Sequence, residues 1–154
     1  MVKVLFVCTG NICRSPMAQF ILEKLVAERG LKEHFVIESA ATTTEEIGNS
    51  PHYGAVRKLR EMGIPMRTHH AVQLTRADYD RYDHIIGMDS RNMRGMQRIV
   101  GSDPAHKLSL LLDYTGHPRE IDDPWYTGDF ETAYRDIYEG CEALLTYLMT
   151  EPGK

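Results

Sequence analysis

The stretch that decides the fold lies near the N-terminus, where residues 2–16 read VKVLFVCTGNICRSP. Its first part, Val2–Val7, is apolar except for Lys3, which is typical of a strand buried on both faces of a sheet. Pro16 suits the first turn of a helix, because proline lacks the N–H that this turn leaves unpaired. The order strand, loop, helix predicts an α/β fold with a functional loop over residues 8–15.

The rest of the chain repeats this alternation of strand-like and helix-like segments. Further strands are predicted at Phe35–Ser39, His84–Met88 and Leu108–Leu112. Helices are predicted from Pro16 to Arg29, from Ser50 and Pro51 to Gly63, from Thr75, over Asn92–Val100 and from Phe130 to Leu148. Such alternation favours a four-stranded parallel sheet flanked by helices on both faces, and we expect residues 1–154 to form a single domain. Ligands of these sheets bind beyond the carboxyl ends of the strands, where the loop lies.

The composition argues against a membrane protein, a nucleic-acid-binding protein and a disulfide-rich protein. The chain has 154 residues, of which 42% are hydrophobic and 26% charged, the profile of a globular protein without a membrane span. A net charge of -4 gives no basic field for nucleic acid. The three cysteines form neither a disulfide framework nor a zinc motif, so we expect a cytoplasmic protein without a zinc site.

The loop has the composition of an oxyanion site. Gly10 lets the backbone approach a ligand closely, and Asn11 tolerates the left-handed conformation that a tight cradle needs. The following helix N-terminus adds unpaired N–H groups and a partial positive charge. The residues predicted to bind phosphate are Thr9, Gly10, Asn11, Ile12, Cys13, Arg14 and Ser15.

Cys8 at the base of the loop is the predicted nucleophile. Donors that favour a phosphate also favour a thiolate, and Ser15 can donate a hydrogen bond to the sulfur. Arg14 can bind two phosphate oxygens with its planar guanidinium. Cys13 is close enough in the sequence to form a reversible disulfide with Cys8 under oxidants.

A second segment, residues 121–126, supplies a candidate acid. Attack on a phosphate ester needs a proton for the leaving oxygen, and Asp122 and Asp123 are both candidates. Pro124 keeps Asp123 out of helical geometry, which predicts a loop. Trp125 and Tyr126 are predicted to wall a pocket for an aromatic leaving group.

Cys8–Pro16, with Asp123-Pro124 more than 100 residues later, resembles the low-molecular-weight protein tyrosine phosphatases. The resemblance implies a two-step mechanism without metal or cofactor, through a phosphocysteine, with Cys8 as nucleophile, Arg14 as phosphate clamp and Asp123 as acid. It also implies tyrosine-phosphorylated proteins or peptides as partners and inorganic phosphate as product. The oligomeric state stays open, with a monomer favoured.

Further positions match this family less directly. Ser39 and His69 correspond to a network that supports the loop, although His70 lies beside His69. Asp89 matches a position near the loop and is equally suited to cap a helix. Glu45 falls where an aromatic wall residue is usual, and its charge would disfavour acidic sequences around the phosphorylated residue.

Three alternatives share parts of this pattern. Protein arginine phosphatases have a similar loop but carry Thr at the position of Ile12. The apolar side chain of Ile12 suits a phenyl ring and so favours phosphotyrosine, whereas Thr9 favours the arginine alternative. Thiol-dependent arsenate reductases need mid-chain cysteines, and none lies between Cys13 and Cys141. A non-catalytic phosphate-binding module would be expected to lose Cys8, Arg14 or the acid.

Overall fold

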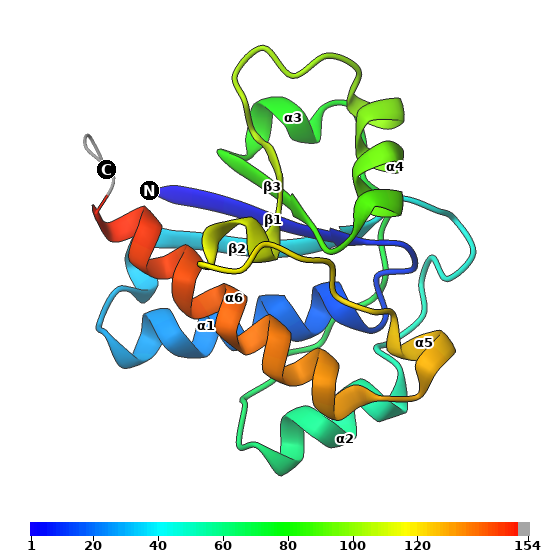
Figure 1. The fold of residues 1–154 in the computed structure, drawn as a ribbon, viewed down its shortest axis with the longest axis vertical. Helices are drawn as coiled ribbons and strands as arrows, with labels where there is room; N and C mark the ends of the chain where they lie inside the picture. Colours follow the sequence, from blue (N-terminus) through cyan, green and yellow to red (C-terminus); the bar gives the residue numbers. More distant parts are fainter. Residues whose placement is uncertain (151–154) are drawn as a thin grey trace.

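The computed structural model describes residues 1–150 as an α/β fold around one parallel sheet (Figure 1). The strand order is β2-β1-β3-β4, from β1 (Val2–Cys8), β2 (Phe35–Ala41), β3 (His84–Gly87) and β4 (Leu108–Leu110). The helices are α1 (Arg14–Glu28), α2 (Tyr53–Glu61), α3 (Asp78–Arg81), α4 (Ser90–Val100), α5 (Pro124–Thr127) and α6 (Phe130–Thr150). Two 3-10 turns, η1 (Lys32–His34) and η2 (Leu111–Tyr114), complete the elements. The predicted four-stranded parallel sheet is therefore confirmed.

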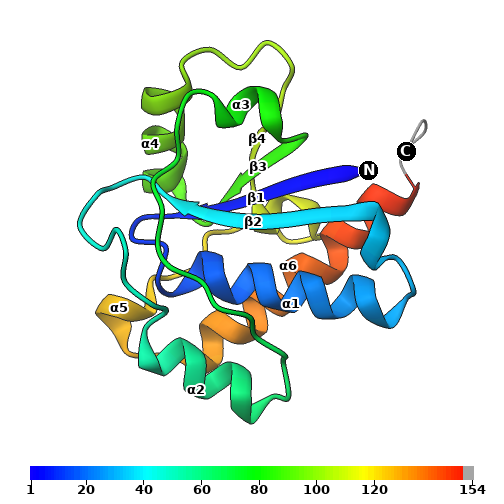
Figure 2. The same ribbon diagram turned by 180° about the vertical axis from the view of Figure 1, so that it is seen from behind.

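Helices cover the sheet on two sides, with α1, α2 and α6 on one and α3 and α4 on the other (Figures 1 and 2). The central strand β1 shows why, since Val4 and Phe6 belong to the large core that includes α1 and α6. Leu5 and Val7 belong to the smaller core that includes residues of α4. This alternation follows from the period of two in a strand, and both sets are buried.

Three predictions about the elements are wrong, and two of them concern the end of a helix or strand. The helix expected from Ser50 and Pro51 begins at Tyr53, because His52 is not helical and its side chain caps the helix. The strand expected to reach Leu112 ends at Leu110, where Leu111 and Leu112 turn inward as part of η2 and are buried in the large core.

The third correction concerns the loop predicted at residues 121–126. Asp123 itself is extended, as the following proline requires. Pro124 then occupies the first position of the one-turn helix α5, and the Asp123 side chain caps it. The remaining helix and strand ends differ from the predictions by a few residues at most.

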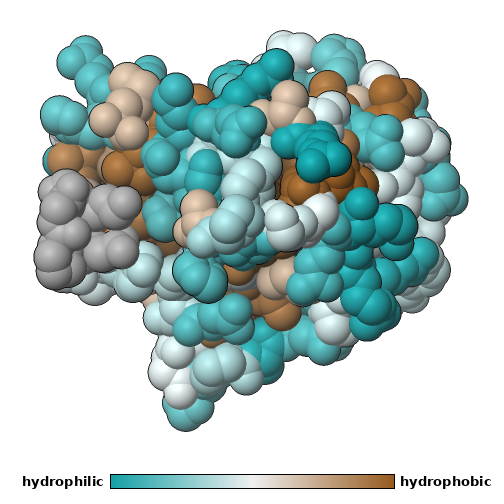
Figure 3. All heavy atoms as spheres, turned by 90° about the horizontal axis from the view of Figure 1, so that it is seen from above, coloured by the Kyte–Doolittle hydropathy of each residue, from teal (hydrophilic) through white to brown (hydrophobic). Residues whose placement is uncertain are grey.

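This architecture places several distant segments around the loop after β1. Parallel pairing of β1 with β2 and β3 brings the residues that follow all three strands to one edge of the sheet. Figures 1 and 2 show α5 beside that edge as well. Hydrophobic residues reach the face drawn in Figure 3 only as separate groups among hydrophilic ones. No helix within residues 1–150 is both long and apolar enough to cross a membrane.

Candidate active site

The loop after β1 wraps around the sulfur of Cys8. The Sγ atom lies 3.0 Å from the Ser15 hydroxyl oxygen and accepts a hydrogen bond from the Ser15 amide at 3.4 Å. Asn11 adopts a φ of 59°, the left-handed conformation that the sequence predicts. The backbone N–H groups of residues 9–13 donate to no other group within the described part of the chain. A strand, a left-handed turn and a helix start thus leave the loop amides without partners in the chain, directly after the Cys8 thiol.

Arg14 is buried beneath this loop, with 1% of its side chain exposed. Its Nη1 donates to Asp89 Oδ2 and to the Ile121 carbonyl oxygen, both at 2.7 Å. Nη2 lies 3.4 Å from Asp123 Oδ2, and Nε has no hydrogen-bond partner among the described residues. One edge of the guanidinium is therefore anchored, while the Nε–Nη2 edge is available for two oxygens of a ligand.

The charge of Arg14 is secured by its surroundings. Burial on its own would lower the pKa of Arg14, but the negative charges of Cys8, Asp123 and Asp89 outweigh it and raise the pKa above its usual value. Asp89 has a second contact, because its Oδ1 accepts the Asn92 amide as the N-cap of α4. Asp89 therefore has both of the roles that were considered for it, since it contacts the loop through Arg14 and also caps α4.

Asn11 is the centre of a buried hydrogen-bond network. Its Nδ2 donates to Ser15 Oγ at 2.7 Å and to Ser39 Oγ at 3.0 Å, and its Oδ1 lies 2.9 Å from His69 Nε2. His70 instead lies 3.1 Å from the Gly48 carbonyl oxygen, outside this network. Burial lowers the pKa of His69, which favours a neutral ring. The structure therefore brings together Ser39, His69 and the loop, as the resemblance implies.

A pocket opens above Cys8. It is lined by Cys8, Thr9, Gly10, Ile12, Cys13, Thr43, Glu45, Glu46, Asp123, Trp125 and Tyr126. The lining includes the three predicted wall residues and Asp123, whereas Asp122 is outside it. Trp125 and Tyr126 are 54% and 70% exposed, so aromatic surface borders the opening. Thr43 and Glu46 were not predicted, because nothing in their local sequence indicates that they return to the loop.

The model of the family described as "Low molecular weight phosphotyrosine protein phosphatase" matches residues 3–153. This chain belongs to that family. Its relatives include the low molecular weight protein-tyrosine-phosphatase YfkJ of Bacillus subtilis, 40% identical over 98% of each chain. The human low molecular weight phosphotyrosine protein phosphatase is 40% identical over 93% of each chain.

Solved structures extend this likeness to the fold. The crystal structure of YfkJ from Bacillus subtilis has a TM-score of 0.95 with 40% identity, covering 99% of this chain and 97% of the other. The crystal structure of a Drosophila arginine phosphatase has a TM-score of 0.86 with 32% identity, covering 97% of this chain and 99% of the other. The low-molecular-weight phosphatase fold thus includes proteins named for two different substrates.

Two contacts of Thr9 in this family member were missed by sequence reasoning. Asn92 is buried; its Nδ2 donates to Thr9 Oγ1 at 3.1 Å, and its Oδ1 accepts the Met88 amide at 3.0 Å. The Thr43 hydroxyl donates to the Thr9 carbonyl oxygen at 2.9 Å. The available signal was the spacing of Asn92 one helical turn after Asp89, which places both on the same side of α4.

The remaining cysteines differ from Cys8 in their surroundings. Cys13 is buried in the loop, and burial together with the charge of Cys8 raises the pKa of its thiol. Cys141 is buried on α6, and burial raises the pKa of its thiol as well. All three cysteines are free thiols. Within residues 1–150 no group of His, Cys, Asp or Glu side chains could hold a metal ion.

Proposed function

We propose that this chain is a protein tyrosine phosphatase that hydrolyses phosphotyrosine and small aryl phosphates through a phosphocysteine on Cys8. The observation that carries the proposal is the set of unused donors next to Cys8, namely the amides of residues 9–13 and Nε of Arg14. Donors fixed in place before the ligand arrives stabilise the charge of the phosphoryl group during transfer. Family membership supports the same reaction.

In the first step the Cys8 thiolate attacks the phosphorus, and the bond from phosphorus to the phenolic oxygen breaks. Asp123 is the proposed donor of the proton that the leaving oxygen requires, since it lines the pocket. Arg14 and the loop amides hold the phosphoryl oxygens. The hydroxyl of Ser15, 3.0 Å from the sulfur, stabilises the thiolate before attack and as it leaves.

In the second step water attacks the phosphorus of the phosphocysteine, and Asp123 takes the proton that the water loses. The bond from phosphorus to sulfur breaks, which regenerates the thiolate and releases inorganic phosphate. Trp125 and Tyr126 border the opening where the phenyl ring of the substrate would lie, and Ile12 adds apolar surface to the lining of the same pocket. The reaction requires no cofactor.

The test compares aryl phosphate hydrolysis by the wild type with that of three variants. Cys8→Ser should have no turnover while still binding phosphate. Asp123→Asn should be slower by roughly 10²–10⁴-fold. Asp122→Asn is the matched control, because this neighbouring carboxylate lies outside the pocket lining and should leave the rate unchanged. A wild type that binds phosphate without turnover would refute the proposal.

Phosphoarginine is the second candidate substrate. The Drosophila arginine phosphatase supports it by fold, and the carboxylates of Glu45 and Glu46 in the pocket lining could face a guanidinium. Ile12 favours phosphotyrosine, because an apolar side chain packs on a phenyl ring more favourably than on a guanidinium. Parallel assays with phosphotyrosine and phosphoarginine peptides decide between them, and Ile12→Thr should shift the preference towards arginine.

The proposed partners are tyrosine-phosphorylated proteins in the cytoplasm. Free thiols at Cys8, Cys13 and Cys141 suit a reducing compartment. The proposed nucleophile can be identified by alkylation, since burial raises the pKa of the Cys13 and Cys141 thiols and makes them poor targets at neutral pH. We expect one equivalent of iodoacetate to label Cys8, and inorganic phosphate to protect it. Labelling of Cys13 first would contradict this assignment.

A further inference from the structure

His52 connects the phosphate-binding loop to helix α2. Its backbone N–H donates to the Ile12 carbonyl oxygen at 2.7 Å. Its ring nitrogen Nδ1 accepts the Gly54 amide at 3.0 Å and thereby caps the helix. The position of His52 is therefore fixed on one side by the loop and on the other by the first turn of α2.

The His52 ring also lies within a group of aromatic side chains. It stacks on Tyr53 with centroids 4.6 Å apart and on Phe130 with centroids 5.4 Å apart. The ring of Trp125 meets it edge-on, at 5.6 Å and an interplanar angle of 83°. Stacked and edge-to-face pairs of this kind are the favoured geometries of aromatic contact.

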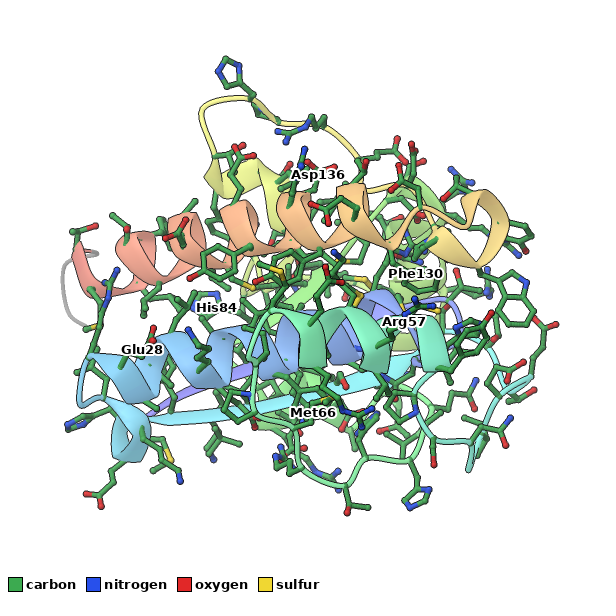
Figure 4. All side chains as sticks on the ribbon, turned by 90° about the horizontal axis from the view of Figure 1, so that it is seen from below. Glu28, Arg57, Met66, His84, Phe130 and Asp136 are labelled. Atoms are coloured by element: carbon green, nitrogen blue, oxygen red, sulfur yellow. The ribbon has the colours of Figure 1, made fainter. Side chains whose placement is uncertain are left out.

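Phe130 provides a firm support for this group. A Cβ atom added at Gly54 would lie 2.5 Å from the Phe130 ring, so the ring rests directly on the first turn of α2. Figure 4 shows Phe130 at the start of α6, near α2, the helix that carries Arg57. Trp125, by contrast, is 54% exposed and stands on a helix of four residues. Within the described part of the chain, the Trp125 ring makes its aromatic contact with His52.

We propose that His52 is a positioning residue that holds the Trp125 ring as a wall of the pocket and so favours aryl over alkyl phosphate esters. The inference rests on the proposed function, because it concerns how the same site selects its leaving group. His52 links Ile12, in the phosphate cradle, to Trp125, at the rim, and both line the pocket. The distance between the bound phosphate and the aromatic wall is thereby set by one residue.

Two substitutions separate the ring of His52 from its capping role. His52→Asn removes the ring but keeps a side-chain oxygen that can cap α2. His52→Phe keeps a ring but loses the cap. We expect His52→Asn to lower kcat/KM for an aryl phosphate by roughly 2- to 10-fold, the range typical of one aromatic contact. kcat/KM for an alkyl phosphate and inhibition by inorganic phosphate should stay unchanged, and His52→Phe should retain most of the aryl preference.

Trp125 is the sole tryptophan of the chain, so its fluorescence reports the position of this ring directly. Lower fluorescence anisotropy and stronger quenching by acrylamide are expected in His52→Asn, with recovery in His52→Phe. His117→Ala, which removes an exposed imidazole elsewhere, is the control. An unchanged aryl-to-alkyl ratio or an unchanged anisotropy in His52→Asn would overturn the inference. A wild type without aryl phosphatase activity would instead refute the proposed function, while the fluorescence would still test the contact.

Discussion

Replacement of Asn11 tests the buried network under the loop more sharply than any other change. The side chain is fully buried, and it makes four hydrogen bonds. Two are short, 2.7 Å to Ser15 and 2.9 Å to His69, and two are longer, 3.0 Å to Ser39 and 3.2 Å from the Val72 amide. At about 1 kcal/mol for each bond, Asn11→Ala should destabilise the fold by roughly 3–5 kcal/mol from this source alone.

The backbone adds a second effect with its own control. Asn11 has a φ of 59°, a conformation that costs about 1–2 kcal/mol for an ordinary L-residue and that Asn and Gly tolerate. Asn11→Gly loses the same four hydrogen bonds without this strain. The unfolded chain of the glycine variant gains entropy, which offsets roughly 0.5–1 kcal/mol of the advantage. Asn11→Gly should therefore be slightly more stable than Asn11→Ala, the reverse of their order in a helix.

Urea unfolding of the three proteins measures both effects, and aryl phosphate kinetics measure their consequence for the site. Both variants should lose activity, because Ser15 is no longer oriented towards the Cys8 sulfur. A total loss of less than about 1.5 kcal/mol in both variants would mean that the network contributes little. A glycine variant clearly less stable than the alanine variant would refute the argument from the left-handed backbone.

Three further predictions concern other parts of the molecule. Burial lowers the pKa of His69 in the folded state, so the folded protein binds fewer protons than the unfolded chain. The free energy of unfolding should therefore fall as pH drops below about 6.5, and His69→Gln should show a weaker dependence on pH. Gly140→Ala should destabilise the fold by about 1–3 kcal/mol, because its Cβ would lie 2.5 Å from a buried leucine, whereas Gly116→Ala meets nothing within 4 Å and should be neutral in thermal unfolding. Thr9→Val and Asn92→Ala should each weaken inhibition by inorganic phosphate, and additive losses in the double variant would contradict a direct contact.

Sequence reasoning predicted the fold well because its strongest signals were local. The continuous apolar run in Val2–Val7 and the helical period after Phe130 each correspond to elements buried as expected. The errors occurred where a side chain changed a boundary. His52 is a poor cap by residue preference, yet its ring nitrogen caps α2 while its backbone N–H donates to the Ile12 carbonyl oxygen, a tertiary contact that local sequence does not indicate.

The candidate site was predictable only in part for a related reason. The loop carries its chemistry in consecutive residues, so Cys8 and Arg14 could be named from the sequence. Glu46 and Asn92 could not, because they approach the loop from segments whose return depends on the sheet topology. The choice of His69 over His70 came from resemblance, since neighbouring residues in an extended segment point to opposite sides and spacing alone does not say which side faces the loop.

The arrangement of the supports explains why this loop needs a whole α/β domain around it. A loop that binds an oxyanion must keep its own N–H groups unpaired. It therefore cannot be held in place by the backbone hydrogen bonds of a sheet or helix, because these would use the same N–H groups. Here Thr9 is held by α4, Asn11 by β2 and the segment after α2, Ile12 by the start of α2, and Arg14 by the end of β3. Every one of these contacts uses a side chain or a carbonyl oxygen of the loop and leaves its N–H groups free. The fold brings these distant segments together at one edge of the parallel sheet, and this arrangement allows the donors to be fixed before a phosphate arrives.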